Sequence, residues 1–418
     1  MHLKKSLILF FIVSILLQAC FTPREQSPIN QQYINLANLY NPKATTIFPE
    51  FTVYNKNDSI TVVYNYFYLP QLRFLMAKGG EQAKILLNYK LTPSLTNRKV
   101  IDTITKILTI RYNKNRRELI FPVQLRPNHD TGFLLNIYVK DLYRKKSNLK
   151  FIYNDKSSRN SPNNFLVKDA RSFRPVFGNV VYPGHQYIIQ HNSGQDSLFI
   201  YHYPLDTTLP KPPFYLGGRT RKIYADTIMK IPSLQAVEFS TPGIYLITAD
   251  SLVQRGKTLV LFNPYYPQID RASQMIPPLA YLTTTEEYAR LLHSYSPKLT
   301  VDSFWISVTE NPQQSKELIK AYYHRVFLAN YYFTTHKQGW QTDRGMIYII
   351  FGPPPVVYKF EDKEQWIYYF AEKGKYISFV FRKNKSRFSD QDYILVPSAQ
   401  YREFWQYAVK QWRSGNIP

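Results

Sequence analysis

Cysteine is nearly absent from the chain, because Cys20 is the single one among 418 residues. With no second thiol, no intramolecular disulfide can form, so every core must be held by burial alone. Glycine is also sparse at 15 residues, whereas tyrosine (35) and phenylalanine (27) are plentiful. This composition favours strands and half-buried surfaces over flexible linkers.

The short motifs of common enzyme classes are missing too. The chain has no His-Glu-x-x-His, Cys-x-x-Cys, Walker loop or Gly-x-Ser-x-Gly. His185, His191 and His202 could share a strand edge, but no Asp or Glu stands at matching parity, so we interpret them as surface or half-buried side chains. We therefore expect no metal and no other cofactor, and the sequence nominates no catalytic residue.

The two carboxylates of a glycoside hydrolase can come from remote parts of a sequence. The sequence therefore does not exclude such a pair. The group Glu361, Asp362 and Glu364 is more simply a solvated hairpin loop. Tyr265, Tyr266 and Tyr281 could stack on a glycan, but core packing explains them as well.

The N-terminus has the pattern of an export signal. Lys4 and Lys5 precede an apolar run, Ser6 to Leu17, that is shorter than the about 20 residues that span a bilayer. The run ends in Leu17-Gln18-Ala19-Cys20, which resembles the lipobox of bacterial lipoproteins. The resemblance implies cleavage after Ala19 and a diacylglycerol on the Cys20 thiol. The alternative is an ordinary signal peptide with a chance cysteine.

The lipobox interpretation divides the start of the chain into a signal peptide (residues 1–19) and a lipidated, proline-marked tether (20–46), with a short helix expected at Gln31–Leu39. No Asp follows Cys20 directly, and no acidic run follows it. We therefore expect an outer-membrane lipoprotein of the cell envelope, on the periplasmic face rather than the cell surface.

The formal net charge is +24. On a membrane-anchored protein, a basic excess favours anionic lipid, acidic glycan or envelope proteins as partners. Export and the lack of a nucleic-acid module argue against nucleic acid. Basic residues crowd at Arg111–Arg117 and at Arg144–Lys146, either as solvated loops or facing phosphate-bearing lipid.

Short β-branched and aromatic runs, separated by Asn, Pro and Asp turns, predict two tandem Ig-like β-sandwich modules at 47–156 and 165–262. A polar linker, Asn154–Asn164, separates them. The strands expected in the first module are Ser59–Leu69, Lys84–Tyr89, Thr103–Ile110, Glu118–Leu125 and Gly132–Val139. Those expected in the second are Val176–Val181, Gln186–His191, Ser197–Tyr203, Gly243–Thr248 and Thr258–Phe262.

Residues 275–418 predict an α+β domain with a small antiparallel sheet. Thr284 or Thr285 can cap one helix. Asn311 can cap a second, which has Pro312 in its first turn and an apolar face repeating at three and four residues to about Thr334. Strands are expected at Met346–Phe351, Gln365–Phe370 and Tyr376–Phe381, and a last helix at Ser398–Arg413.

Gly339-Trp340-Gln341-Thr342-Asp343, followed by Arg344 and by Phe351-Gly352-Pro353-Pro354, resembles the signature of GWxTD-domain proteins. A preceding Tyr323–Asn330 run and a following Trp366–Tyr369 strand continue the resemblance over about 297–401. It implies an exported bacterial protein, often a lipoprotein, with a domain of unassigned activity.

The motif has two interpretations. In the structural one, Gly339 permits a positive φ, Trp340 fills the gap between helix and sheet, and Thr342 and Asp343 fix the turn into a strand. Gly352 and Pro353 then stop that strand. In the functional one, Asp343 forms a polar site with Arg325 or Arg344 at the mouth of the sheet.

The leading hypothesis is a non-enzymatic interaction or assembly component at the outer membrane. The alternative is a binder or hydrolase of an envelope glycan such as peptidoglycan. A third possibility, a structural lipoprotein that holds layers apart, is not separable from the first by sequence.

Overall fold

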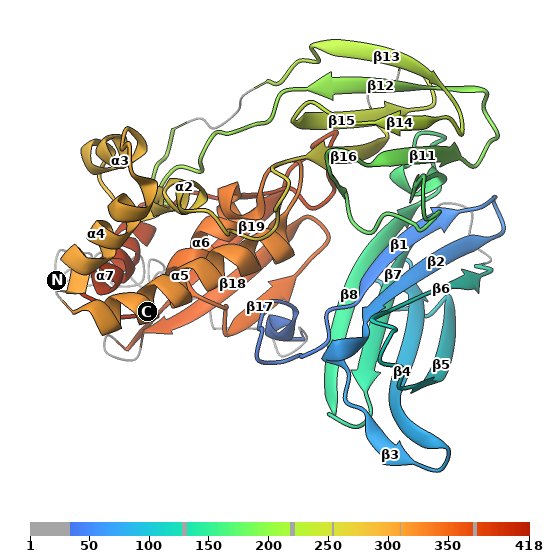
Figure 1. Ribbon diagram of the computed structural model, residues 1–418, viewed down its shortest axis with the longest axis horizontal. Coiled ribbons are helices and arrows are strands. Elements are labelled where there is room, and N and C mark those ends of the chain that lie inside the picture. Colours follow the sequence, from blue (N-terminus) through green and yellow to red (C-terminus); the bar gives the residue numbers. More distant parts are fainter. Residues whose placement is uncertain (1–33, 128–131, 218–221, 253–254, 310, 371–373) are drawn as a thin grey trace, which may run out of the picture. The chain divides into compact units, whose positions relative to one another are not determined.

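A computed structural model describes residues 34–418 except 128–131, 218–221, 253–254, 310 and 371–373. The predicted signal peptide, Cys20 and most of the tether lie outside the described residues. The chain separates into two compact units, Met1–Asn35 and Leu36–Pro418, and the second is described below. It is a mixed α+β structure, with several sheets, almost all of their pairs antiparallel, in the N-terminal half and helices with a small antiparallel sheet C-terminally (Figure 1). A search of the described helices found none with the length and apolarity that crossing a membrane requires.

The first β region contains two antiparallel sheets, one ordered β1-β2-β6 and one ordered β3-β4-β7-β8, with β5 on the other side of β4. Their inward side chains, such as Val63, Leu87 and Ile137, form one core. The expected strands all occur, and β1, β3 and β8 were not expected. The strands are β1 (Glu50–Asn55), β2 (Thr61–Tyr68), β3 (Leu75–Ala77), β4 (Gly80–Thr92), β5 (Asp102–Arg111), β6 (Glu118–Leu125), β7 (Gly132–Asp141) and β8 (Lys146–Asp155).

The expected linker at Asn154–Asn164 is instead a partly buried polar junction. Asn154, the residue before the end of β8, donates to Asn55 Oδ1 at 2.8 Å, and Asn55 donates to Asn164 Oδ1 at 3.0 Å. Asn160 accepts from the backbone of Ala249 at 2.7 Å. Amides of asparagine satisfy buried groups here, so a composition typical of a solvated linker does not mean exposure.

The second β region has a five-stranded sheet, β10-β16-β15-β12-β13, and a three-stranded sheet, β14-β11-β9. Only the short β10–β16 pair is parallel among the described pairs. The expected strand Val176–Val181 shrinks to its last two residues. The strands are β9 (Phe165–Asp169), β10 (Val180–Val181), β11 (Gln186–His191), β12 (Ser197–Tyr203), β13 (Thr227–Pro232), β14 (Ala236–Glu238), β15 (Gly243–Thr248) and β16 (Lys257–Leu261).

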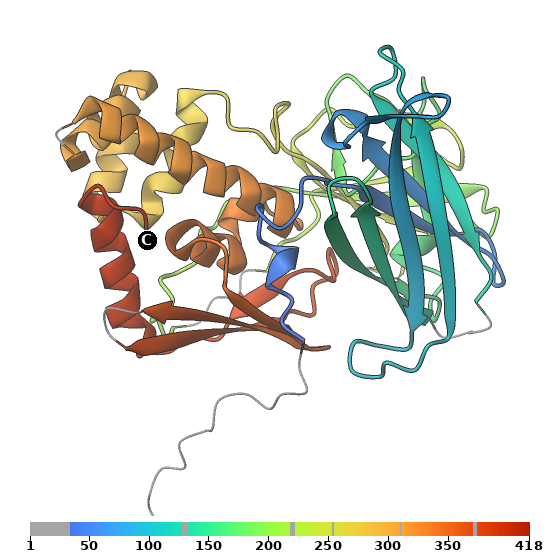
Figure 2. The same ribbon diagram turned by 90° about the horizontal axis from the view of Figure 1, so that it is seen from below.

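The C-terminal region packs helices against an antiparallel sheet ordered β17-β18-β19-β20, with α5 and α6 along one side of it (Figure 2). The helices are α2 (Ala272–Met275), α3 (Thr285–Leu292), α4 (Pro297–Thr309), α5 (Pro312–Phe333), α6 (Asp343–Phe351) and α7 (Tyr401–Arg413). The strands are β17 (Val356–Lys359), β18 (Lys363–Phe370), β19 (Lys375–Lys383) and β20 (Tyr393–Leu395). Short 3₁₀ turns are η1 (Ala37–Leu39), η2 (Leu69–Gln71), η3 (Pro162–Asn164), η4 (Pro277–Tyr281) and η5 (Gly339–Gln341).

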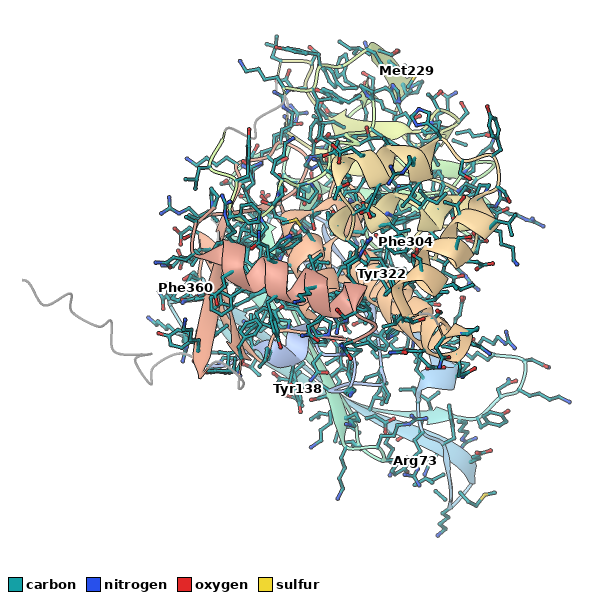
Figure 3. The ribbon with its side chains drawn as sticks, turned by 90° about the vertical axis from the view of Figure 1, so that its left-hand side faces the viewer. Arg73, Tyr138, Met229, Phe304, Tyr322 and Phe360 are labelled. Carbon is teal, nitrogen blue, oxygen red and sulfur yellow. The ribbon has the colours of Figure 1, made fainter. Side chains whose placement is uncertain are left out.

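Both predicted helix caps are confirmed. Thr284 accepts from the backbone of Glu287, and Asn311 accepts from the two N–H groups that follow Pro312. Helix α4 was not expected. Figure 3 labels Phe304 of α4 and Tyr322 of α5, whose rings both pack against Trp305.

The strand predicted at Met346–Phe351 is wrong, because these residues belong to helix α6. Every residue from Arg344 to Phe351 is buried, so the segment shows no polar face. A helix that is apolar all round cannot be told from a buried strand by periodicity. The Thr342 hydroxyl caps the first turn of α6, and such a cap stabilises a helix and not a strand.

Candidate functional site

The Gly-Trp-Gln-Thr-Asp motif forms the 3₁₀ turn η5 and the first residue of α6. Thr342 is the N-cap: its Oγ1 accepts from Gly345 N at 3.0 Å and donates to the Gly339 carbonyl at 2.7 Å. One hydroxyl therefore satisfies an unpaired helix N–H and also closes the preceding turn. Thr342 joins the turn to a helix, not to a strand.

Gly339 meets the backbone of α5 at a distance that only glycine permits. A Cβ at this position would lie 2.0 Å from the carbonyl oxygen of Ala329. The expected positive φ is not found here; it occurs at Gly352, whose φ of +80° lies at the C-cap of α6. Gly352 and the following Pro353 thus end a helix rather than a strand.

Trp340 is buried between α5 and η4. Its backbone N–H donates to Asn330 Oδ1 at 3.1 Å, its indole donates to Gln338 at 2.8 Å, and its carbonyl accepts from the Tyr281 hydroxyl at 2.7 Å. The Tyr266 hydroxyl accepts from Gly339 N at 3.1 Å. Tyr266 and Tyr281 are therefore buried polar partners of the motif, and neither presents a face for glycan stacking.

Tyr265 keeps 40% of its surface exposed. The Arg271 guanidinium covers one face of its ring, at 4.4 Å from the centroid. A cation–π contact already occupies the position that a sugar ring would take on this face.

Asp343 fastens α6 to the edge of the C-terminal sheet. Its Oδ2 accepts from the backbone N–H of Leu395 in β20 at 2.6 Å. A carboxylate in the first turn of a helix is also favoured by the helix dipole.

Arg344 enters a buried group that we call the Glu364 cluster: Tyr40, Arg344, Lys359, Glu364 and Trp366. Arg344 Nη1 lies 3.2 Å from Glu364 Oε1, and Lys359 forms an ion pair with the same oxygen. The Tyr40 hydroxyl donates to both carboxylate oxygens at 3.0 and 3.1 Å, and the Trp366 indole donates at 3.2 Å. Glu364 is 0% exposed, so the solvated loop predicted for it is wrong, whereas Glu361 and Asp362 are exposed.

The carboxyl group of Glu364 and the phenol of Tyr40 each keep one protonation state at neutral pH. Burial raises the pKa of Glu364, but the cations of Lys359 and Arg344 outweigh it and lower that pKa to about 2. Burial, and then the Glu364 anion, raises the pKa of the Tyr40 hydroxyl. A carboxylate that stays ionised and a phenol that stays protonated do not exchange protons near pH 7.

Arg325 acts at the opposite end of α6. From α5 it donates to the carbonyls of Ile349 and Ile350, at 3.1 and 3.2 Å, and to the Pro418 carbonyl at 2.7 Å. The Ile349 and Ile350 carbonyls lie in the last turn of α6, where a helix leaves carbonyls unpaired. Burial lowers its pKa to about 10, which leaves it charged at neutral pH. The nine residues of α6, roughly 12 Å along the axis, separate Arg325 from the end that carries Arg344.

The cluster also holds the segment that follows the predicted tether. Leu36 N donates to the Val357 carbonyl on β17 at 2.8 Å, and the Tyr348 hydroxyl donates to the Tyr40 carbonyl at 2.9 Å. The Tyr40 ring lies 5.3 Å from that of Trp366. Residues 36–40 are therefore part of the C-terminal core. No sequence pattern predicts this contact, because Tyr40 and Glu364 are 324 residues apart.

The three histidines considered as ligands have separate partners. His185 lies 3.5 Å from Asp169, His191 bonds Ser193 at 2.7 Å, and His202 pairs with Asp226 at 2.6 Å. Among the residues that the structure describes, no three His, Cys, Asp or Glu side chains group as metal ligands would.

Comparison with known families finds that the GWxTD domain model matches residues 243–414. The match begins at β15 and so extends further back than the resemblance at 297–401. It includes the segment with Tyr266, whose hydroxyl bonds the motif. A search of curated proteins found no match to this chain.

Proposed function

Taking residues 243–414 as a GWxTD domain, we propose that this protein is an outer-membrane lipoprotein that acts as a non-enzymatic interaction or assembly component of the cell envelope. In this proposal Cys20 carries the lipid, and the two β regions are tandem Ig-like sandwich modules that offer docking surfaces. The protein works on the periplasmic face, beside envelope proteins and anionic lipid or glycan.

One observation carries the proposal: Arg344, which directly follows the motif, bonds Tyr40 and so holds residues 36–40. Arg344 is 2% exposed, and its cation is shared between Glu364 and the Gln391 carbonyl. A substrate would have to displace these contacts in the core. The same residues suit the anchoring of a tether that comes from the membrane.

The position of Leu36 determines where a force from the membrane would first act on the protein. Leu36 lies sixteen positions after Cys20, and a fully extended chain of that length reaches roughly 55 Å at most. Under this proposal, the lipid connects first to the GWxTD domain, although that domain comes last in the sequence. Force or confinement from the membrane would act on the Tyr40 contact before reaching the β modules.

The test is affinity purification of the full-length protein from detergent-solubilised membranes. An epitope inserted beside Leu252, which is 89% exposed, avoids the C-terminus, where Pro418 bonds Arg325. We expect the wild type to fractionate with outer membranes and to bring down a stable partner. We expect Cys20→Ala to leave the membrane and to lose that partner.

A lipidated monomer with no stable partner would contradict the assembly role. An unmodified thiol at Cys20 in the native protein would contradict the anchoring. Release of soluble fragments from purified peptidoglycan by the wild type would replace the proposal with the hydrolase alternative.

A further inference from the structure

Strand β5 is an unpaired edge of the larger N-terminal sheet. Among the strands that the structure describes, it pairs with β4 alone, from Asp102 to Arg111. Tyr112 N donates to Glu81 O in the continuing register, so the ladder to β4 uses the even-numbered residues of β5. The backbone groups that point away from β4 are those of Thr103, Thr105, Ile107, Thr109 and Arg111.

Strand β6, the neighbouring edge of the other sheet, is protected in a way that β5 is not. Leu69 N donates to Arg117 O, so the even-numbered residues of β6 face away from β2. Pro122 occupies one of these positions and has no N–H to offer. No proline interrupts the ten residues of β5. The Thr103 N–H donates to Asp102 Oδ1 at 2.7 Å, and the donors and acceptors from Thr105 to Arg111 form a row open to another strand.

A groove of about 530 Å³ lies between β5 and β6, beside the loop that joins them. Four apolar side chains that belong to or pack against the core of the first β region line it: Leu108, Ile110, Leu119 and Phe121. Ile110 is buried, and the other three are partly buried. Arg111 and Arg116 also line it. Strand side chains alternate between faces, so a strand added to β5 would place every second side chain over this groove.

The groove has a positive rim. Four basic side chains form this rim, and none of them makes an ion pair within the described part of the chain: Arg111, Lys114, Arg116 and Arg117. The nearest carboxylate in sequence, that of Glu118, pairs with Arg174 at 2.6 Å. The rim therefore favours a partner that brings carboxylates.

We propose that the β5 edge and this groove bind an extended segment of another envelope protein as an added β-strand. Apolar side chains of that segment fill the groove at alternate positions, its backbone bonds the open row of β5, and carboxylates at its end meet Arg111 and Arg116. This inference rests on the proposed function: it assigns the β5 edge as the surface that binds a partner in the envelope assembly.

The test uses full-length protein in detergent micelles and a fluorescein-labelled ten-residue peptide of alternating Val and Thr, with Asp at both ends. Binding is read by fluorescence anisotropy. Ile107→Lys places a charge in the middle of the edge at a residue that is 63% exposed, and Thr109→Pro removes an N–H that β4 does not use. Each should weaken binding at least tenfold.

Ile228→Lys is the matched control, because Ile228 is 60% exposed on β13, an edge strand of the second β region. It should bind the peptide as the wild type does. A peptide with Lys in place of Asp should bind at least tenfold more weakly. Circular dichroism checks that each variant is folded. If Thr109→Pro does not fold, Ile107→Lys alone tests the edge.

Equal binding by wild type and Ile107→Lys would overturn the proposal. So would a concentration-dependent dimer lost in Ile107→Lys, which would make a second copy the occupant. Binding to anionic phospholipid vesicles that Arg111→Gln abolishes and Ile107→Lys leaves intact would assign the rim to lipid instead. Because Cys20→Ala protein should bind the peptide equally, failure here is distinguishable from failure of the membrane purification.

Discussion

Replacing Glu364 with Gln removes the one anion that neutralises two buried cations. Arg344 and Lys359 would remain in the core facing a neutral amide. Breaking a buried pair in this way costs about 3–5 kcal/mol of unfolding free energy at neutral pH, because a buried charge is left uncompensated. The side-chain volume barely changes, so packing contributes little.

The cost should depend on pH with a defined sign. The pKa of Glu364 falls from an ordinary 4.5 to about 2 in the folded state, so its contribution is complete above pH 4.5 and is lost as the pH falls toward 2. The pKa difference corresponds to about 3 kcal/mol at neutral pH, of which about 2 kcal/mol is lost by pH 3. The stability gap between wild type and Glu364→Gln should narrow by that amount between pH 6 and pH 3.

Urea unfolding followed by tryptophan fluorescence is the assay. The chain has five tryptophans, all between Trp305 and Trp412, so the signal reports on the GWxTD domain alone. Glu317→Gln on α5 is the control, because that side chain is 56% exposed and forms a surface ion pair with Lys320. A gap that stays constant from pH 6 to pH 3, or a Glu364→Gln protein as stable as wild type at pH 6, would refute the reasoning.

Three further variants test the motif with the same titration. Gly339→Ala should lose about 3 kcal/mol, because its Cβ would meet the Ala329 carbonyl at 2.0 Å; wild-type stability would show that the two backbones can separate freely. Thr342→Ala should lose about 1 kcal/mol and Thr342→Ser much less, since only the capping hydroxyl is required; equal losses would point to packing. Asp343→Asn should lose about 1–2 kcal/mol through its bond to Leu395 and still co-purify the membrane partner, whereas unchanged stability with a lost partner would indicate a functional site.

Local chemistry explains which elements the sequence predicts well. The caps at Thr284 and Asn311 depend on side chains and backbone within three residues, so both are visible in sequence. Strands that alternate between buried and less buried residues, such as β4 and β11, show the pattern that identifies them. Helix α6 has no exposed face, and its run of Ile, Tyr and Phe has the composition of a strand.

Long-range contacts explain what the sequence could not give. The motif drew attention to Arg344, but its partners come from a hairpin and from the N-terminal segment. Glu364 stands near Glu361 and Asp362, and its neighbours in sequence indicate a polar turn. Only the fold shows that its side chain points inward, because β18 alternates and Trp366 lies on the same buried face.

Hydrogen exchange at residues 36–40 tests most directly the claim that the GWxTD domain holds the segment that follows the predicted tether. The amides of Leu36, Leu39 and Tyr40 are hydrogen-bonded, so mass spectrometry of this peptide in the full-length protein should show protection comparable to that of β18. Glu364→Gln should reduce that protection. Exchange of residues 36–40 at the rate of an unprotected chain, while β18 stays protected, would contradict the account.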